Sequence, residues 1–261
     1  MLRSICTKIP VLGESELGLI TVMKIELKKI NAFCTIIAAL TPECRLLVTP
    51  TGISALAVDT ANVGMVSCSL PKESFQEYSE EKAEIGMDLP KWKGIIGILK
   101  DGPITIDRDK DGRLIFSDGR YTYTLTPLDP TTVRKRPNVP NIGLPASVVL
   151  DAKEYQETIK AMGVIGDKIK FEVDGERFTL SAEGDTDKLR KELTGQPQDK
   201  KNGPAVSSLF SLDYLKDTAR AMKDASTITL HLGQDHPCRF DFELEGIEAS
   251  FLIAPRIEQE G

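Results

Sequence analysis

The sequence repeats itself, and this internal repeat restricts the possible folds more than any other feature. The segment that begins at Asp88 matches the segment that begins at Ser211, which lies 123 residues later. The strand–turn–strand pattern around Gly52 matches the pattern around Gly175 at the same spacing. A strand that runs into a helix also opens each half. Because these matches share nearly one spacing, we predict two copies of one β-rich unit, each with two helices.

A proline-rich stretch separates the two copies. Each proline fixes φ and lacks a backbone donor, so neither a helix nor a central strand can run through this stretch. A connection of this length without secondary structure is either a linker or a functional loop. The prolines are Pro127, Pro130, Pro137, Pro140 and Pro145. We therefore predict an extension or misassigned start at 1–22, an N-terminal unit at 23–127, a connecting loop at 128–145 and a C-terminal unit at 146–261.

The composition is typical of a soluble globular protein. Hydrophobic residues make up 41% of the chain and charged residues 28%, and the net charge is −6. The longest apolar runs are far too short to cross a membrane. The five cysteines have no paired spacing, so we expect neither a disulfide framework nor a zinc site, and we expect a reducing cytoplasm. They are Cys6, Cys34, Cys44, Cys68 and Cys238.

One acidic run resembles a calcium-binding loop. Asp107, Asp109, Asp111 and Gly112 copy the first half of an EF-hand loop. The twelfth position is Asp118 instead of glutamate, and the flanking patterns alternate as strands do. A hairpin turn is therefore the better interpretation of this run.

The remaining polar residues do not form a recognisable active site. His231 and His236 have no cysteine or carboxylate at ligand spacing, so we interpret them as surface or loop residues. The sequence contains no glycine-rich phosphate loop and no nucleophile elbow. A two-domain enzyme with a site between the repeats would need a titratable cluster near the linker, which Arg134, Lys135 and Arg136 do not supply. We therefore expect no catalytic residue, no metal and no cofactor.

Basic residues gather on the solvent faces of three of the four predicted helices. At helical spacing these residues lie opposite the apolar stripes. A charged helix face usually serves only solvation, but three such faces in an acidic chain favour a polyanionic partner. The residues are Lys91, Lys93 and Lys100 in the helix expected near 90–100, Lys160 in the helix near 152–162, and Lys216, Arg220 and Lys223 in the helix near 211–222.

Each unit is also expected to have an edge strand that a single chain leaves unpaired. We place these edges at about 120–126 and 186–193. Exposed edges invite pairing with another chain, and a head-to-tail contact between unlike edges closes into a ring if the rotation fits. The predicted interface residues are Arg120, Tyr121 and Tyr123 on one edge, and Lys188, Leu189, Arg190 and Leu193 on the other.

Several motifs resemble one known family. The sequences FLIAPRIEQE, FSLDYLKDTARAM and ALAVDTANVGMV, together with the tandem repeat, resemble the DNA polymerase sliding clamps of archaea and eukaryotes, the proliferating cell nuclear antigen family. The match covers about Met23 to Gly261, and the acidic composition and short loops resemble archaeal members. This resemblance implies an α+β fold with two clamp domains per chain, and three chains in a closed ring with helices inside and sheets outside. Such a ring encircles duplex DNA of any sequence and serves replication and repair as a processivity factor.

The resemblance also assigns two sites. It implies that the basic helix residues face DNA, although the first helix has Asn31, Thr35 and Ala38 where the family usually has lysines, with Lys28 and Lys29 beside it. It implies that polymerase, clamp loader, ligase and nuclease bind through short peptides under the linker. The implied peptide site contains Val58, Val63, Met65, Val139, Pro140, Ile142, Pro237, Phe251, Leu252, Ala254 and Pro255.

A protein-interaction scaffold that never meets DNA is a further alternative. Topological loading of the chain onto circular DNA would distinguish a clamp from such a scaffold.

Overall fold

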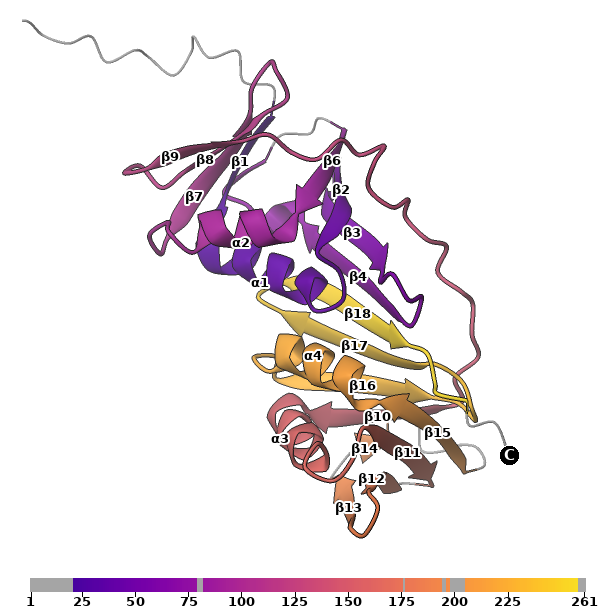
Figure 1. The fold of residues 1–261 in the computed structure, drawn as a ribbon. Helices are drawn as coiled ribbons and strands as arrows, with labels where there is room; N and C mark the ends of the chain where they lie inside the picture. The colour runs from indigo at the N-terminus through magenta and orange to yellow at the C-terminus, as the bar shows by residue number, and fades with distance from the viewer. Residues whose placement is uncertain (1–20, 79–81, 176, 194–195, 198–204, 258–261) are drawn as a thin grey trace, which may run out of the picture.

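The computed structural model describes residues 21–78, 82–175, 177–193, 196–197 and 205–257. The prediction for the first twenty residues therefore lies outside the described chain. Within the described residues the two halves share one order of elements, so the predicted repeat is confirmed at the level of the fold (Figure 1).

The first repeat consists of the following elements: β1 (Thr21–Glu26), α1 (Leu27–Ala38), β2 (Glu43–Thr49), β3 (Gly52–Val58), β4 (Gly64–Pro71), a 3₁₀ turn η2 (Lys72–Ser74), β5 (Glu77–Tyr78), β6 (Ala83–Asp88), α2 (Leu89–Ile96), β7 (Pro103–Arg108), β8 (Leu114–Ser117) and β9 (Thr122–Leu125). The second repeat consists of β10 (Ala146–Asp151), α3 (Ala152–Met162), β11 (Lys168–Asp174), β12 (Arg177–Glu183), β13 (Lys188–Leu193), β14 (Gln196–Pro197), β15 (Val206–Ser211), α4 (Leu212–Met222), β16 (Thr227–Leu232), β17 (Cys238–Leu244) and β18 (Ile247–Ile253).

Helix boundaries follow the strength of the local capping signals. Asp88 caps α2 by accepting the N–H of Lys91 at 3.1 Å, and Asp151 caps α3 by accepting the N–H of Glu154 at 2.7 Å. The predicted start of α3 is confirmed. The apolar spacing of the sequence predicts the first helix at about 31–40, whereas α1 begins four residues earlier at Leu27. Glu26 before it makes no capping bond that would mark this boundary.

The sheets join the two repeats into one structure. A nine-stranded sheet runs in the order β14-β10-β16-β17-β18-β4-β3-β2-β6, and the antiparallel pair β18–β4 connects the repeats at its centre. A five-stranded sheet has the order β5-β1-β7-β8-β9, and a four-stranded sheet has the order β13-β12-β11-β15. Strands β9 and β13 both lie at sheet edges, so the prediction of two edge strands is confirmed.

The helices and the linker lie on opposite sides of the molecule. Figure 1 shows α2, α1, α4 and α3 in a row along one side, while the linker runs along the other side past the sheets. The apolar stripes predicted for α2, α3 and α4 are buried against the sheets. From 126 to 145 the chain forms neither a helix nor a strand apart from one bridge between Leu128 and Gly86, which confirms the extended linker.

Two polar motifs have the structures of ordinary strands and turns. Strands β7 and β8 form a hairpin, and the buried Asp109 accepts the Nε–H of Arg113 at 2.8 Å inside the turn, which confirms the hairpin interpretation. His231 lies on β16, as expected, but it is half-buried, with Nε2 3.0 Å from Oδ2 of Asp241. His236 is exposed in the loop after β16, which confirms its interpretation as a surface or loop residue. No helix among the described residues is long and apolar enough to serve as a membrane span.

The partly buried Tyr78 and the fully buried Tyr155 differ in what their hydroxyl groups contact. The hydroxyl of Tyr78 donates to the carbonyl of Thr49 at 2.7 Å, whereas the buried hydroxyl of Tyr155 has no hydrogen-bond partner among the described residues. An unpaired buried polar group costs about 1–3 kcal/mol. We therefore expect Tyr155→Phe to keep or raise the free energy of unfolding, while Tyr78→Phe lowers it by about 1 kcal/mol. Urea unfolding at one fixed protein concentration measures both, and a loss of stability in Tyr155→Phe would contradict this account.

Candidate partner site and basic helix face

A small apolar cavity lies between the linker and the outer face of the nine-stranded sheet. Its volume is about 50 Å³. Apolar side chains of the linker form one wall, and β3, β4, β17 and β18 form the floor. The lining residues are Leu56, Met65, Ser67, Val139, Pro140, Ile142, Leu144, Arg239, Ser250 and Leu252.

Strand alternation decides which residues of the sheet reach this cavity. Leu252 lies opposite Met65 in the β18–β4 ladder, and both side chains point outward. Phe251 points to the other side, is fully buried and stacks on Phe242 with ring centroids 5.6 Å apart. The assignment of Phe251 to the peptide site is therefore wrong, because neighbouring residues of a strand face opposite sides.

The predicted set and the observed lining overlap in part. The structure brings together Met65, Val139, Pro140, Ile142 and Leu252 at the cavity. Sequence reasoning missed Leu56, Ser67, Leu144, Arg239 and Ser250. Of these, Ser67 and Ser250 could have been found by counting two positions along the strand from Met65 and from Leu252. The other predicted residues, Val58, Val63, Pro237, Ala254 and Pro255, do not line this cavity.

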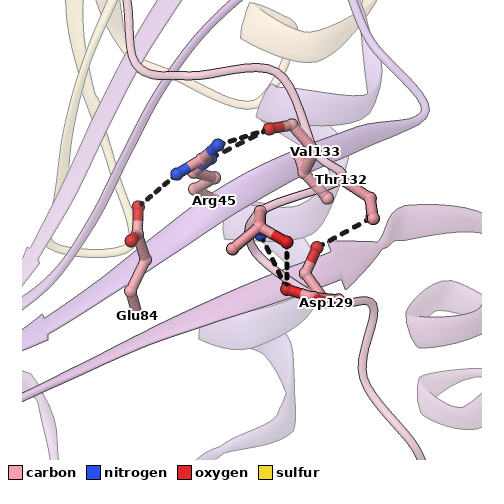
Figure 2. Close-up of polar contacts among 6 residues, drawn as sticks. Arg45, Glu84, Asp129, Thr132 and Val133 are labelled. Carbon is pink, nitrogen blue, oxygen red and sulfur yellow. Dashed lines mark hydrogen bonds and ion pairs between the residues drawn. The ribbon is translucent and has the colours of Figure 1, made fainter.

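The first part of the linker is held by polar contacts, which Figure 2 shows. Arg45 on β2 donates from Nε and Nη2 to the carbonyl of Val133, at 3.0 and 2.7 Å, and its Nη1 lies 3.4 Å from Oε1 of Glu84. The Asp129 carboxylate accepts the N–H of Thr131 at 2.8 Å, and this bond holds the pKa of Asp129 below its usual range. Val133 is buried, so this part of the linker has a fixed position.

The second part of the linker, residues 134–144, has polar contacts with other described residues only at its start. Arg134 donates from Nη1 to the carbonyl of Asp59 at 2.7 Å, and Arg136 lies within 3.5 Å of the hydroxyl of Ser54. Beyond these anchors, no hydrogen bond joins residues 137–144 to any other residue that the structure describes. Only apolar contacts hold them over the cavity, although the side chain of Val139 is 64% exposed. This stretch is therefore the part of the linker that a ligand can displace at the lowest cost.

The opposite side of the molecule carries the predicted basic residues. Lys91, Lys93, Lys160, Arg220 and Lys223 are exposed on α2, α3 and α4, or directly after α4, and Lys216 is half-buried. Lys91, Arg220 and Lys223 each form an ion pair with a nearby aspartate of the same region. Among the described residues, Lys93, Lys160 and Lys216 form no such pair, so their charges are available to a ligand.

One predicted member of this basic face is placed wrongly. Helix α2 ends at Ile96, with Gly97 as its C-cap, so Lys100 lies beyond the helix. The backbone N–H of Lys100 donates to Oδ2 of Asp118 at 2.9 Å, which holds this residue beside the turn before β9. The sequence analysis predicted a helix that is too long, because Gly94 and Gly97 were not taken as signals that the helix ends.

The first helix contributes to this side without a row of lysines. A hollow of about 390 Å³ lies between α1 and α4, with Asn31 and Thr35 on one wall and Arg220 on the other. Lys28 at its rim lies 2.8 Å from Oε2 of Glu245, and this contact raises the pKa of Lys28. Lys28, Arg220 and Lys223 at this hollow each pair with a carboxylate, so the unpaired positive charge of the described helix row lies elsewhere, on Lys93, Lys160 and Lys216.

The two edge strands differ in character. Tyr121, 56% exposed, and Tyr123, 43% exposed, give the β9 edge apolar surface, and the guanidinium of Arg120 lies 5.2 Å from the ring centre of Tyr121. Strand β13 exposes mainly charged side chains. The assignment of Leu193 to the interface is wrong, because its side chain is buried in its own repeat.

Known proteins are similar to this chain in sequence and in fold. Residues 138–257 match the family model described as "Proliferating cell nuclear antigen, C-terminal domain". The chain is 40% identical over 228 residues to the DNA polymerase sliding clamp of Methanocorpusculum labreanum, covering 85% of this chain and 92% of that one. It is 42% identical over 229 residues to the DNA polymerase sliding clamp of Methanoregula boonei, with the same coverage of both chains, 85% and 92%.

A solved structure extends the similarity to three dimensions. The structure titled "C-terminal region of FEN-1 bound to A. fulgidus PCNA" superposes with a TM-score of 0.86 at 31% sequence identity. The superposition covers 92% of this chain and 100% of that chain. The tandem repeat, the joined sheets and the row of helices are therefore shared with a solved protein over nearly the whole described chain.

Proposed function

The chain belongs to the proliferating cell nuclear antigen family of DNA polymerase sliding clamps, and we propose that three copies close into a ring with α1–α4 of each copy around duplex DNA. As a member of this family, the chain is a DNA sliding clamp and processivity factor. Sliding clamps are a family of proteins that are not enzymes. The observation that supports the ring most directly is the separation of the basic helix face from the linker cavity. DNA then lies inside the ring and protein partners bind outside it.

The proposed domains are the two repeats, 23–127 and 146–261, with 128–145 as the connection. Two repeats per chain give six like domains in a ring of three chains. We propose that the ring acts in the cytoplasm of an archaeal cell, because the curated relatives are archaeal clamps.

The proposed contact between chains joins the β9 edge of one copy to the β13 edge of the next. Both strands are unpaired on one side in the single chain, and head-to-tail pairing of unlike edges lets the ring close. Arg120, Tyr121 and Tyr123 are the proposed residues on one side, and Lys188, Leu189 and Arg190 on the other. Because exposed charges contribute, the contact is expected to weaken as salt concentration rises.

Light scattering after gel filtration tests this assembly. At micromolar concentration the wild-type chain is expected to have the mass of three chains, and Tyr123→Asp is expected to shift the population to single chains, because a charge then lies inside the pairing edge. The control Ile257→Asp also places a charge at an exposed apolar position, outside both edge strands. A wild-type monomer or dimer across salt concentrations would contradict the ring.

The proposed ligand of the linker cavity is a short peptide with aliphatic and aromatic anchors. Apolar pockets beside an extended segment suit such peptides, and a few anchor residues provide most of the binding energy. The related A. fulgidus clamp was solved with the C-terminal region of FEN-1 bound, and we propose that this chain binds a peptide of that kind. Polymerase, clamp loader, ligase and nuclease are its proposed sources.

A further inference from the structure

The turn between β3 and β4, residues 59–64, is organised around one buried carboxylate. Asp59 has a relative exposure of 6%. Its side chain accepts the backbone N–H of Ala61 at 3.1 Å and those of Val63 and Gly64 at 2.8 Å each. These three bonds fix the path of the turn, because each orients one peptide group toward the same carboxylate.

A tyrosine of the other repeat completes this arrangement. Tyr214 on α4 donates its hydroxyl to Oδ2 of Asp59 at 2.6 Å. Burial raises the pKa of Tyr214 to about 12, together with its bond to Asp59, so the phenol keeps its proton at neutral pH. Its ring packs against Gly64, where an added Cβ would lie 3.3 Å from the ring. One end of this contact is therefore on the helix row and the other is in the sheet of the first repeat.

The same turn holds both outer segments beside the partner cavity. Arg134 of the linker donates to the carbonyl of Asp59 at 2.7 Å and to the amide oxygen of Asn62. Asn62 has a φ of 59°, in the left-handed region that few residues other than glycine adopt. The position of its side chain therefore depends on the conformation of this turn. The N–H of Ala254 in the C-terminal tail donates to the carbonyl of Val63 at 2.8 Å.

We propose that Tyr214 is a positioning residue for the partner site, acting through Asp59 on the linker anchor Arg134. The proposal rests on the proposed function, because it assumes that partner peptides bind under the linker. Residues 137–144 are held without hydrogen bonds to other described residues, so their position depends on the anchors that precede them. Tyr214 does not line the cavity and makes no hydrogen bond to a described linker residue, yet it holds the turn to which the anchor Arg134 is bound.

Limited proteolysis of the peptide-free clamp tests this role without any partner. Lys135 is exposed beside the anchor Arg134, and trypsin cuts after it faster when the linker leaves its place more often. In Tyr214→Phe the aromatic ring stays in place but the hydroxyl is lost, and we expect cleavage after Lys135 to accelerate about fivefold, a typical effect between coupled sites. The matched control is Tyr155→Phe, which removes a buried tyrosine hydroxyl from α3 that has no partner among the described residues. The control is expected to leave the rate of linker cleavage unchanged.

Peptide binding gives the second readout. The probe is a synthetic peptide of the C-terminal region of A. fulgidus FEN-1, titrated by calorimetry into each variant. We expect Tyr214→Phe and Arg134→Met each to weaken binding about fivefold, and the double variant to be no weaker than Arg134→Met alone, because both changes break one chain of contacts. Thermal unfolding of each variant checks that the fold is kept.

The outcomes separate this proposal from the one on which it rests. An unchanged rate of linker cleavage in Tyr214→Phe, or additive effects in the double variant, would overturn the positioning role. If the wild type binds no peptide at all while Tyr214→Phe still accelerates linker cleavage, the partner site is refuted and the link from Tyr214 to the linker is supported.

Discussion

Replacing Ile142 with aspartate is expected to weaken binding of a partner peptide at least tenfold. Ile142 lines the cavity and lies in the part of the linker that no described hydrogen bond holds. A carboxylate at this position removes an apolar wall and must lose water when a peptide covers it. An interface anchor of this kind contributes about 2 kcal/mol or more, which is more than a factor of ten in affinity.

Calorimetry with the FEN-1 peptide measures this effect, and the matched control is Val164→Asp. Val164 is 84% exposed in the loop after α3 and does not line the cavity, so the same kind of substitution there should leave affinity unchanged. Light scattering should give the same mass for Ile142→Asp as for the wild type. Equal peptide affinity in Ile142→Asp and the wild type would move the partner site elsewhere on the chain.

The way in which the linker is held adds a condition to this prediction. The linker forms one wall of the cavity, which is small at about 50 Å³. Residues 137–144 can move at low cost, whereas Val133 is buried and held by Arg45. Peptide binding should therefore displace residues 137–144 and leave Val133 in place.

The sequence was sufficient to predict the repeat, the linker and most helix positions. These follow from local rules, because prolines exclude regular structure and apolar periodicity marks the buried stripe of each helix. The end of α2 was predicted too late, since the apolar pattern continues to Leu99 after the helix has ended at Ile96. Local periodicity alone does not distinguish a final turn from a helix.

The site was harder to predict because it is built from distant segments. Arg239 and Leu56 reach the cavity only because β17, β18, β4 and β3 are neighbours in one sheet, and that order cannot be read from the chain. Phe251 was misassigned because the motif was carried over as a run of consecutive residues. In a strand, consecutive side chains point to opposite faces of the sheet. The contact between Asp59 and Tyr214 joins residues far apart in the chain, and no local pattern indicates it.

Replacing Lys160, Lys216 and Arg220 with alanine is expected to reduce clamp-stimulated DNA synthesis strongly and to flatten its salt dependence. A clamp that slides cannot read bases, so its contacts go to phosphates, and each lost contact lowers the salt slope by about one. Two of these residues, Lys160 and Lys216, form no ion pair with any described residue, so they can bind phosphate without first breaking a bond.

The matched control for this triple variant removes the same charge from outside the helix row. Lys72, Lys82 and Lys135 are exposed, and their replacement by alanine also lowers the net charge by three. Processive synthesis on primed circular DNA, measured from low to high salt, should fall in the helix variant and stay near wild type in the control. Trimer mass and peptide affinity should stay constant in both. If both variants lose activity equally, net charge and not the helix face attracts DNA. If neither loses activity at any salt concentration, the helices do not face the duplex.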